Sequence, residues 1–472
     1  MSGAKKYSLI INGQKLETSN FHEVHNPSNG DIVGLMPVAG RTELDLAVKA
    51  AQAAFPAWSS MEDRQRQQIC LKIAGILDSH KDELARLITL EQGKPLNAQG
   101  SLGEVGGATF WSDYTAHLDI PVEVVEDAGL AKVEIHRKPI GVVGSITPWN
   151  FPLMIAMWHI VPALRAGNTV VIKPSEYTPL ATIRMVELLN TILPAGVLNI
   201  VTGRGELGAL MSSHPGINKI VFTGSAPTGR KIMGSAAENL KRLTLELGGN
   251  DAAIILPDCN IEEITEKIFW GAFSNSGQIC ACIKRLYVHD EIYEKLCKSL
   301  VSYAAKIKMG DGLDETSQLG PVQNAMQFNI VRECVEDAKK RGAKILIGGD
   351  PTHQNGYFYP VTLVADIEDG AMLVDREQFG PALPIIRFTN IDKVIETANN
   401  NPNGLGGSVW SKDIAKAKAL ASRLECGIAW INGHGGIQPN APFGGVKQSG
   451  IGVEFGKEGL YQNTNIQTII VN

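Results

Sequence analysis

Apolar positions repeat with two different spacings along this chain, and the change in spacing divides it into regions. Intervals of three and four residues over 42–55 and 61–91 predict surface helices that cover a sheet. Near the start, Tyr7–Ile11 and 14–17 flank an Asn-Gly pair, which predicts a β-hairpin. Alternation over Val133–His136 predicts a further strand.

Four short apolar runs, rich in β-branched residues, follow this helical region. They cover 141–146, 169–172, 198–201 and 219–222, and helical segments separate them. This order is typical of βαβ units in a parallel sheet that helices cover on both faces. Ligands bind beyond the carboxyl ends of such strands, and each run here ends in small or polar residues. We therefore expect one ligand-binding face.

After Leu247 the pattern restarts and predicts a second α/β domain. The predicted strands are 252–256, 285–288, 343–347, 361–364, 383–388 and 427–431, and the predicted helices are 261–275, 291–307, 324–341, 391–399 and 414–424. The apolar tail 464–471 is β-prone, and a lone terminal strand of this kind usually pairs with another strand, which a second subunit can supply.

Composition narrows the class of protein. A chain of 472 residues is too long for one ordinary core. Its net charge of −5 without a basic stripe gives no reason to expect a nucleic-acid partner. Seven cysteines without paired C-x-x-C spacings favour a reducing compartment, with no disulfide framework and no metal site. The longest apolar run, 153–164, is too short to cross a membrane. We expect a cytoplasmic protein.

Cys280 is the candidate nucleophile. It lies in a small-residued stretch, Phe273–Cys282, directly after Gly277-Gln278-Ile279. A thiol at a bend can meet backbone N–H groups that stabilise an oxyanion, and modest tuning of its pKa makes it reactive. The alternative is a buried small hydrophobic residue.

Two further side chains carry potential chemistry. The amide of Asn150, in the turn Thr147–Pro152, can donate to an oxyanion; the alternative, favoured by this residue alone, is an Asx turn. Glu246 lies between Leu245 and Leu247, and burial there would raise its carboxyl pKa toward that of a general base. The alternative, again favoured by the residue alone, is a solvated glutamate at a strand end.

Two glycine motifs are candidates for a phosphate site. Gly203–Gly208 matches G-x-G-x-x-G, but no acid follows about 20 residues later, so a tight turn is favoured. Gly224–Gly229 leaves a predicted strand and enters a helix, whose free N–H groups suit a phosphate. Lys173 and Glu176, at another strand end, can meet a ribose.

Seven motifs occur together and in order: Pro148–Pro152, Lys173–Glu176, Phe222–Ser225, Leu245–Gly249, Gly277–Cys280, Glu377–Pro381 and Pro442–Gly445. With them, essentially the whole chain resembles the aldehyde dehydrogenase superfamily in its NAD(P)-dependent, non-acylating form. The resemblance implies that Cys280 attacks the aldehyde, that Asn150 and the Cys280 N–H hold the oxyanion, and that Glu246 activates the water that hydrolyses the thioester.

The resemblance also implies a cofactor site. Lys173 and Glu176 would hold the adenosine ribose, and Glu176 would disfavour the 2′-phosphate of NADP, so NAD is expected and NADP is possible. Ser225 would hold a phosphate, Glu377 the nicotinamide ribose, and Phe379 would pack near the nicotinamide. The full predicted set is Ile146, Thr147, Pro148, Trp149, Lys173, Ser175, Glu176, Gly205, Gly208, Phe222, Thr223, Gly224, Ser225, Thr228, Leu247, Glu377 and Phe379.

The implied architecture is a Rossmann-like cofactor domain (1–116 and 139–247), a catalytic domain (248–448) and a small β oligomerisation element (117–138 and 449–472), with a homodimer or homotetramer expected. The predicted substrate pocket comprises Met154, Trp158, Phe273, Ile279 and Ala281, and residues 432–440 are expected to shape its mouth. No arginine pair lies beside the nucleophile, which favours an apolar aliphatic or aromatic aldehyde. The alternatives are a semialdehyde, an esterase or acyl-transfer reaction of the thiol without redox turnover, and a non-catalytic relative.

Two positions depart from the family pattern. Asn250 stands where many relatives have lysine, which removes a charge beside Glu246. Cys282 lies two residues after Cys280 and is expected to be a packing residue; the alternative is a reversible disulfide between these two cysteines.

Overall fold

The computed structural model describes residues 3–127, 131–351 and 355–472. Its first sheet has the strand order β2-β1-β9-β8-β7-β10-β11-β21, and the five strands from β9 to β11 run parallel. The strands are β1 (Leu9–Ile11), β2 (Gln14–Leu16), β7 (Val142–Ile146), β8 (Thr169–Lys173), β9 (Leu198–Ile200), β10 (Lys219–Thr223), β11 (Arg242–Glu246) and β21 (Gly450–Ile451). The four predicted apolar runs are therefore neighbouring strands, and the hairpin β1–β2 is confirmed.

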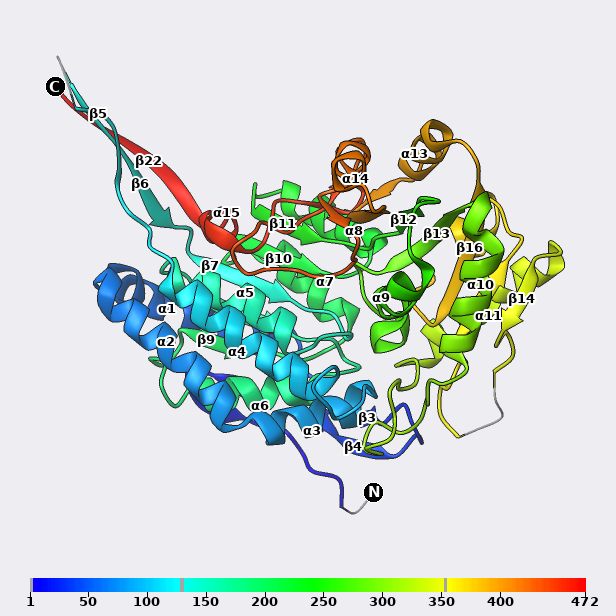
Figure 1. Ribbon diagram of the computed structural model, residues 1–472. Coiled ribbons are helices and arrows are strands. Elements are labelled where there is room, and N and C mark those ends of the chain that lie inside the picture. Colours follow the sequence, from blue (N-terminus) through cyan, green and yellow to red (C-terminus); the bar gives the residue numbers. More distant parts are fainter. Residues whose placement is uncertain (1–2, 128–130, 352–354) are drawn as a thin grey trace.

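Helices cover this sheet, some directly and others as an outer layer on those helices (Figure 1). They are α1 (Arg41–Ser60), α2 (Asp63–Ser79), α3 (Lys81–Gln92), α4 (Ser101–His117), α5 (Met154–Arg165), α6 (Leu180–Leu189), α7 (Gly205–Ser213) and α8 (Ala226–Ala237). Helix α4 was not predicted, because its glycines and scattered polar residues give no clear apolar stripe. Those glycines permit close packing, and a Cβ on Gly107 would lie 2.8 Å from the sulfur of Met154 on α5.

The second sheet has the order β14-β15-β16-β13-β12-β18-β19. Its strands are β12 (Asp251–Ile255), β13 (Ile283–His289), β14 (Lys344–Ile347), β15 (Thr362–Ala365), β16 (Ala382–Phe388), β18 (Gly406–Trp410) and β19 (Ile428–Ile431). Its helices include α9 (Ile261–Phe273), α10 (Asp290–Ala304), α11 (Ala325–Lys340), α13 (Ile391–Asn399) and α14 (Ile414–Ala421). The sequence missed β18, which reads Gly-Gly-Ser-Val-Trp and is buried throughout.

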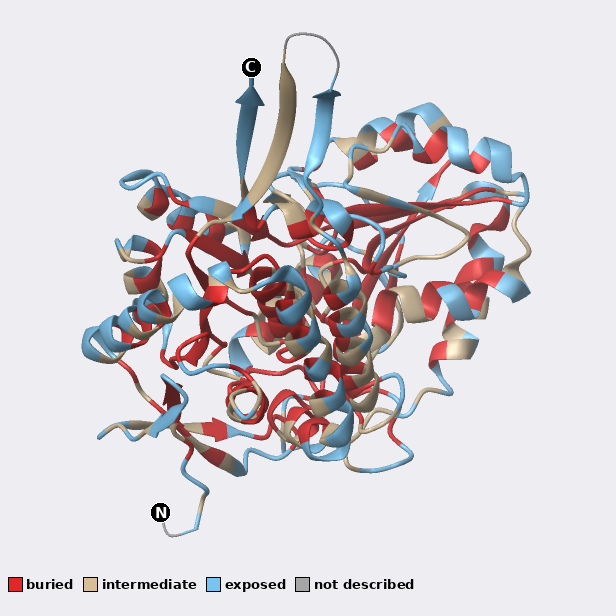
Figure 2. Cartoon of the chain, turned by 90° about the vertical axis from the view of Figure 1, so that its left-hand side faces the viewer, coloured by how far each residue is buried: buried red, intermediate tan, exposed pale blue. Residues whose placement is uncertain are grey.

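A three-stranded antiparallel sheet projects from the body. The terminal strand β22 (Thr464–Val471) pairs with β6 (Lys132–Pro139) of the same chain, and β5 (Glu123–Asp127) lies on the other side of β6. The predicted partner strand is thus supplied within this chain. Figure 2 shows the three strands standing clear of the body, with β5 and most of β22 exposed.

Smaller elements complete the chain: the hairpin β3 (Phe21–His25) and β4 (Ile32–Pro37), β17 (Asn403–Gly404) and β20 (Val446–Lys447), and α12 (Met372–Asp375) and α15 (Gly456–Tyr461). Residues 1–2, 128–130 and 352–354, which the predicted domain ranges include, lie outside the described residues. The predicted α/β class is confirmed, whereas the exact domain boundaries stay a prediction. No helix in the described ranges is long and apolar enough to cross a membrane.

Candidate active site

The carboxyl ends of neighbouring parallel strands bring the predicted residues to one edge of the first sheet. Ile146 on β7 pairs in register with Lys173 on β8 and with Phe222 on β10. Thr223, which ends β10, pairs with Glu246, which ends β11. Residues that are far apart in the sequence therefore share the ligand-binding face that the strand pattern predicts.

The candidate nucleophile, Cys280, follows a tight turn, residues 275–279, that needs unusual backbone angles; we call it the nucleophile turn. Asn275, Ser276 and Gly277 all have positive φ, at 49°, 55° and 72°. Such angles are strained for residues other than glycine, and the surroundings must hold them. The side chain of Gln278 does so: its Nε2 donates to the carbonyls of Asn275 (2.9 Å) and Pro321 (3.2 Å). The turn therefore places Cys280 in a fixed position.

Cys280 is half-buried in an environment that disfavours its thiolate. Burial raises the pKa of this thiol well above its ordinary value, and the negative charges of Glu377, Glu246 and Asp251 raise it further. Proximity to Glu246 and Glu377 is informative, because these are the carboxylates predicted for the general base and the cofactor site. In this arrangement the reactive thiolate requires a proton acceptor or a nearby positive charge.

The amide of Asn150 reaches the nucleophile turn. Its Nδ2 donates to the carbonyl of Gln278 at 3.0 Å, two residues before Cys280, and the side chain is buried. The side-chain hydrogen bond thus joins two domains, whereas an Asx turn would hold the residue's own backbone. This geometry supports the oxyanion-donor interpretation.

Glu246 is buried, with 4% of its surface exposed, so the alternative of a solvated strand-end glutamate is wrong. Neither carboxylate oxygen has a hydrogen-bond partner within the described part of the chain. Burial raises the pKa of Glu246 well above its ordinary value, and the charge of Glu454 raises it further. A buried carboxylate without partners is suited to take a proton from a substrate or a water molecule.

A buried polar network that the sequence did not reveal includes Thr223, the strand neighbour of Glu246. Nε2 of His159, on α5, is 3.1 Å from Oε1 of Glu454 and 3.0 Å from Oγ1 of Thr223. Lys219, at the start of β10, is also buried, and burial lowers its pKa to about 7, although the charge of Glu454 opposes this. In the sequence His159 stands within an apolar run and Glu454 between Val453 and Phe455, so neither showed a recognisable motif.

An apolar cluster surrounds Cys280. Its buried members are Ala281, Leu405, Phe443 and Phe455, and its partly buried members are Trp111, Trp158, Cys280, Ile428, Trp430 and Ile437. The rings of Trp158 and Phe455 are 4.7 Å apart, and those of Trp111 and Trp158 are 5.8 Å apart. Sequence reasoning missed Trp111 because it lies on the unpredicted α4.

The predicted substrate-pocket residues separate in the structure. Trp158 and Ala281 belong to the cluster around Cys280. Phe273 lies instead in the core of the second domain, with its ring 4.9 Å from Phe269, and Met154 packs against the helical core of the first domain. Ile279 is half-buried in the nucleophile turn. The structure therefore does not bring Phe273 or Met154 into the cluster around the nucleophile.

Several predicted cofactor residues show geometry that suits a bound nucleotide. Ser225 is the N-cap of α8, yet its side chain caps no backbone N–H of this helix, and the hydroxyl instead lies 3.0 Å from that of Thr228. Gly229 allows α8 to pack close to Leu247, the residue after β11. A Cβ on Gly229 would lie only 2.6 Å from the Leu247 side chain. The N-terminal N–H groups of α8 therefore remain available at the sheet edge.

The other predicted cofactor residues lie along the same edge. Nζ of Lys173 donates to the carbonyls of Pro174 and Gly203, both at 2.9 Å. Burial lowers the pKa of Lys173, and the charge of half-buried Glu176 opposes this change. The hydroxyl of Thr147 is buried without a partner among the described residues. Ser175 and Pro148 are in the loops that follow β8 and β7. In the weaker glycine motif no residue has positive φ, and Gly205 begins α7.

Glu377 brings a carboxylate from the second domain to this edge. It accepts from the backbone N–H of Gly249 at 3.2 Å, and burial raises its pKa to about 7. A Cβ on Gly248 would displace this carboxylate, so glycine at this position lets Glu377 lie close to the backbone. Nearby, Phe379 has a positive φ of 46° and its ring packs edge-on against Trp149 at 5.4 Å. Strain of this kind is often found at functional sites.

The two departures from the family pattern both have structural roles. Sγ of Cys282 donates to the carbonyls of Ala272 (2.9 Å) and Gly271 (3.2 Å), and Cys280 and Cys282 are both free thiols. This supports the packing interpretation. Nδ2 of Asn250 donates to the carbonyl of Val374 at 2.8 Å, so this side chain is held within the second domain.

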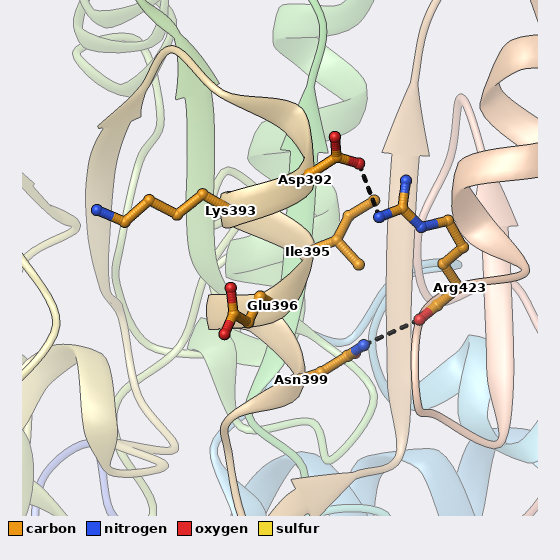
Figure 3. Close-up of a pocket in the computed structure, with 6 residues that line it drawn as sticks. All are labelled: Asp392, Lys393, Ile395, Glu396, Asn399 and Arg423. Carbon is orange, nitrogen blue, oxygen red and sulfur yellow. Dashed lines mark hydrogen bonds and ion pairs between the residues drawn. The ribbon is translucent and has the colours of Figure 1, made fainter.

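A hollow of about 590 Å³ lies elsewhere, beside α13 (Figure 3). Its lining includes the ion pair of Arg423 and Asp392, at 2.8 Å, and contains none of the predicted site residues. Because none of the predicted site residues lines this hollow, we assign it no function. No group of three or more potential metal-ligating side chains occurs in the ranges that the structure describes.

Comparisons with known proteins agree with this geometry. The model of the aldehyde dehydrogenase family matches residues 14–469. Phenylacetaldehyde dehydrogenase of Pseudomonas fluorescens is 37% identical, over 98% of this chain and 96% of its own length. The NAD+ complex of aldehyde dehydrogenase from Bacillus cereus has a TM-score of 0.96 at 35% identity, covering 99% of this chain and 97% of that one. Betaine aldehyde dehydrogenase of Staphylococcus aureus with NAD+ has a TM-score of 0.95 at 34% identity, covering 99% and 94%.

Proposed function

This chain belongs to the aldehyde dehydrogenase family, and from that premise we propose that it oxidises an aldehyde to the free carboxylic acid through a covalent intermediate on Cys280. The observation that carries the proposal is the convergence of three groups. Cys280 follows the turn to which Asn150 donates, and the buried carboxylate of Glu246 is close enough to raise the pKa of the thiol.

In the first step the thiolate of Cys280 attacks the carbonyl carbon, a C–S bond forms, and the carbonyl oxygen becomes an oxyanion. The amide of Asn150 and the backbone N–H of Cys280 donate to that oxyanion, which stabilises charge where it develops. Bound NAD+ would accept the hydride that leaves the former aldehyde carbon. The acyl group then remains on Cys280 as a thioester.

Glu246 drives the second step. Its carboxylate takes a proton from a water molecule, the resulting hydroxide attacks the thioester carbon, and the C–S bond breaks to release the carboxylic acid and regenerate the thiolate. A carboxylate whose two oxygens lack partners suits this role. The presence of Glu246 favours hydrolysis over acyl transfer to another thiol.

The residues present fit a dinucleotide. The N–H groups at the start of α8 would hold a phosphate together with Ser225, and Lys173 and Glu176 would hold the adenosine ribose. Glu377 would hold the nicotinamide ribose, in agreement with its buried and weakly bonded carboxylate. Glu176 disfavours the extra phosphate of NADP, so we propose NAD as the preferred cofactor.

The apolar cluster favours an apolar aliphatic or aromatic aldehyde. Trp111, Trp158 and Phe455 lie within 5.8 Å of one another as ring centroids, and this cluster includes Cys280 itself. Aromatic rings gain most from burying another apolar group. The P. fluorescens relative is named for an aromatic aldehyde, which supports the same class.

We also propose a homodimer or homotetramer assembled through the projecting sheet. Val124 and Val125 of β5 and Ile466, Ile470 and Val471 of β22 are exposed apolar residues on it. Unpaired strand edges with exposed apolar side chains favour pairing with another chain. Sedimentation of the purified chain tests this proposal, which a monomer would contradict.

The catalytic proposal is tested by NAD+ reduction across short aliphatic, long aliphatic, aromatic and semialdehyde substrates, with Cys280→Ala measured beside the wild type. We expect NADH only from the wild type and the highest kcat/KM for apolar aldehydes. Hydrolysis of an ester substrate without NAD+, together with no NADH from any aldehyde, would favour a thiol esterase instead. The absence of NADH with either NAD+ or NADP+ would contradict redox turnover.

A further inference from the structure

A fully buried ion pair lies directly behind the turn that presents Asn150. Nζ of Lys94, two residues after the end of α3, is 2.6 Å from Oε2 of Glu104 on α4. The two side chains are 1% and 0% exposed. The same Nζ donates to the backbone carbonyl of Asn150 at 2.7 Å and lies 3.6 Å from the centre of the Phe151 ring.

Glu104 holds the other end of this turn. Its Oε1 accepts from the backbone N–H of Leu153 at 2.9 Å and of Met154 at 3.2 Å, where α5 begins. These N–H groups lack partners within the helix, and a carboxylate is well suited to cap them. One carboxylate thus bonds the start of α5 through one oxygen and Lys94 through the other.

Together the two side chains hold the backbone from the carbonyl of Asn150 to the N–H of Met154. Lys94 binds the carbonyl of Asn150 and Glu104 binds the N–H groups three and four residues later. On the opposite side Nδ2 of Asn150 donates to Gln278 of the nucleophile turn. A further contact, 3.3 Å from Nδ2 of Asn275 to the carbonyl of Asn150, links the same peptide to that turn. The residue that supplies the proposed oxyanion donor, Asn150, is therefore held through its backbone carbonyl by the ammonium group of Lys94.

We propose that Lys94 and Glu104 are positioning residues for the oxyanion donor Asn150. This inference rests on the proposed function. Burying two charges is costly, and a well-packed apolar pair is often equally stable. The role of this ion pair is to orient the turn that carries Asn150. An amide displaced by about 1 Å loses most of its stabilisation of a developing charge.

The competing explanation is that the pair only stabilises the fold. A mutant cycle separates the two explanations, because residues that act through one group are not additive with its removal. The test variant is the pair Lys94→Met with Glu104→Gln, which leaves no unpaired charge and keeps an oxygen for the N–H groups of Leu153 and Met154. It is made in the wild type and in Asn150→Ala.

In the wild-type background we expect kcat to fall about 10- to 100-fold with less than threefold change in the affinity for NAD+. In the Asn150→Ala background we expect the same substitutions to lower kcat further by less than about threefold. An equal fold-loss in both backgrounds, or no loss in the wild type, would overturn the proposal. A wild type without aldehyde oxidation would refute the proposed function itself, so the two failures are distinguishable.

The control is another ion pair of the first domain, Asp63 with Arg165, in which Nη2 is 2.8 Å from Oδ2, the arginine side chain is fully buried and the aspartate is half-exposed. Asp63→Asn with Arg165→Met is expected to lower stability without changing kcat of the folded enzyme. If the Lys94 and Glu104 double variant does not fold, Glu104→Gln alone is used. It must show the same loss of kcat and the same dependence on Asn150, and its absence would overturn the proposal.

Discussion

Nε2 of His434 lies 3.3 Å from Oδ2 of Asp251, and neither side chain is exposed to solvent. Nδ1 of the same imidazole is 2.9 Å from the hydroxyl of Ser408, and the ring packs 4.6 Å from that of Trp430. Asp251 begins β12 two residues after Gly249, and His434 belongs to the loop expected at the mouth of the substrate site. The pair therefore joins that loop to the strand beneath the nucleophile.

The charge of Asp251 also acts on Cys280, whose thiol pKa it helps to raise. We expect Asp251→Asn to lower the pKa of this thiol, because one negative charge near the thiolate is removed. The N–H of Gly406 donates to Oδ1 of Asp251 at 3.0 Å, and the asparagine keeps an oxygen that can accept this hydrogen bond. Alkylation by iodoacetamide, followed against pH, should then reach its half-maximal rate at lower pH. The surface variant Asp45→Asn is the control, and an unchanged profile in Asp251→Asn would contradict the assignment.

Glu246→Gln should separate the two chemical steps. Gln cannot take a proton from water, so hydrolysis of the thioester should slow by about 10²- to 10⁴-fold, whereas the first NADH should still form. Rapid mixing with NAD+ and aldehyde is expected to give a burst of about one NADH per active site, followed by a slow phase. Loss of the burst together with turnover would show that Glu246 acts before hydride transfer.

Glu454→Gln is expected to move the acid limb of the kcat–pH profile to lower pH than in the wild type. Burial and the charge of Glu454 both raise the pKa of Glu246, and a general base must be deprotonated to act. Activity of the wild type is therefore expected to fall as pH decreases through this raised pKa. Removal of the Glu454 charge lowers the pKa of Glu246, so the acid limb of kcat should move to lower pH. A shift to higher pH would contradict the coupling between these carboxylates.

Cofactor preference is predicted to depend on Glu176. The carboxylate of Glu176 lies near Arg204, because both charges change the pKa of His22. Burial lowers that pKa most, the charge of Arg204 lowers it further, and the charge of Glu176 raises it. Glu176→Gln removes the repulsion of a 2′-phosphate and leaves Arg204 to attract it. We expect kcat/KM with NADP+ to rise about tenfold, with a smaller change for NAD+. Exposed Glu206 on α7 offers the matched control, Glu206→Gln, for which neither value should change.

The parallel strands were predictable because each is buried on both faces and therefore forms an uninterrupted apolar run, such as Thr169–Ile172. Helix α4 and strand β18 were not, because glycines that allow close packing also erase the apolar period on which prediction depends. The proposed catalytic residues lie in motifs, whereas Lys94, Glu104, His159 and Glu454 have partners between 10 and almost 300 positions away. A contact of that kind leaves no local pattern and becomes visible only in three dimensions.

Asp63 is expected to stabilise the first domain in a pH-dependent manner. Arg165 is fully buried and pairs with Asp63 through two nitrogens, at 2.5 and 2.8 Å, and Arg66 adds a third contact at 2.9 Å. Burial alone would raise the pKa of Asp63, but the hydrogen bond and charge of Arg165, followed by those of Arg66, lower it overall. The stabilisation is therefore present above the ordinary aspartate pKa and is lost as pH falls through the lower folded-state value.

Breaking a fully buried pair costs about 3–5 kcal/mol, but Asp63 is half-exposed and water can partly replace it. We expect Asp63→Asn to lower the free energy of unfolding by about 2 kcal/mol at neutral pH and by less in acid, where the wild type has lost the same charge. Urea denaturation of wild type and variant at pH 7 and at a series of pH values below the ordinary aspartate pKa, down to about pH 2, measures this difference. A difference that grows toward acid would mean that the carboxylate stabilises the fold by some means other than its charge.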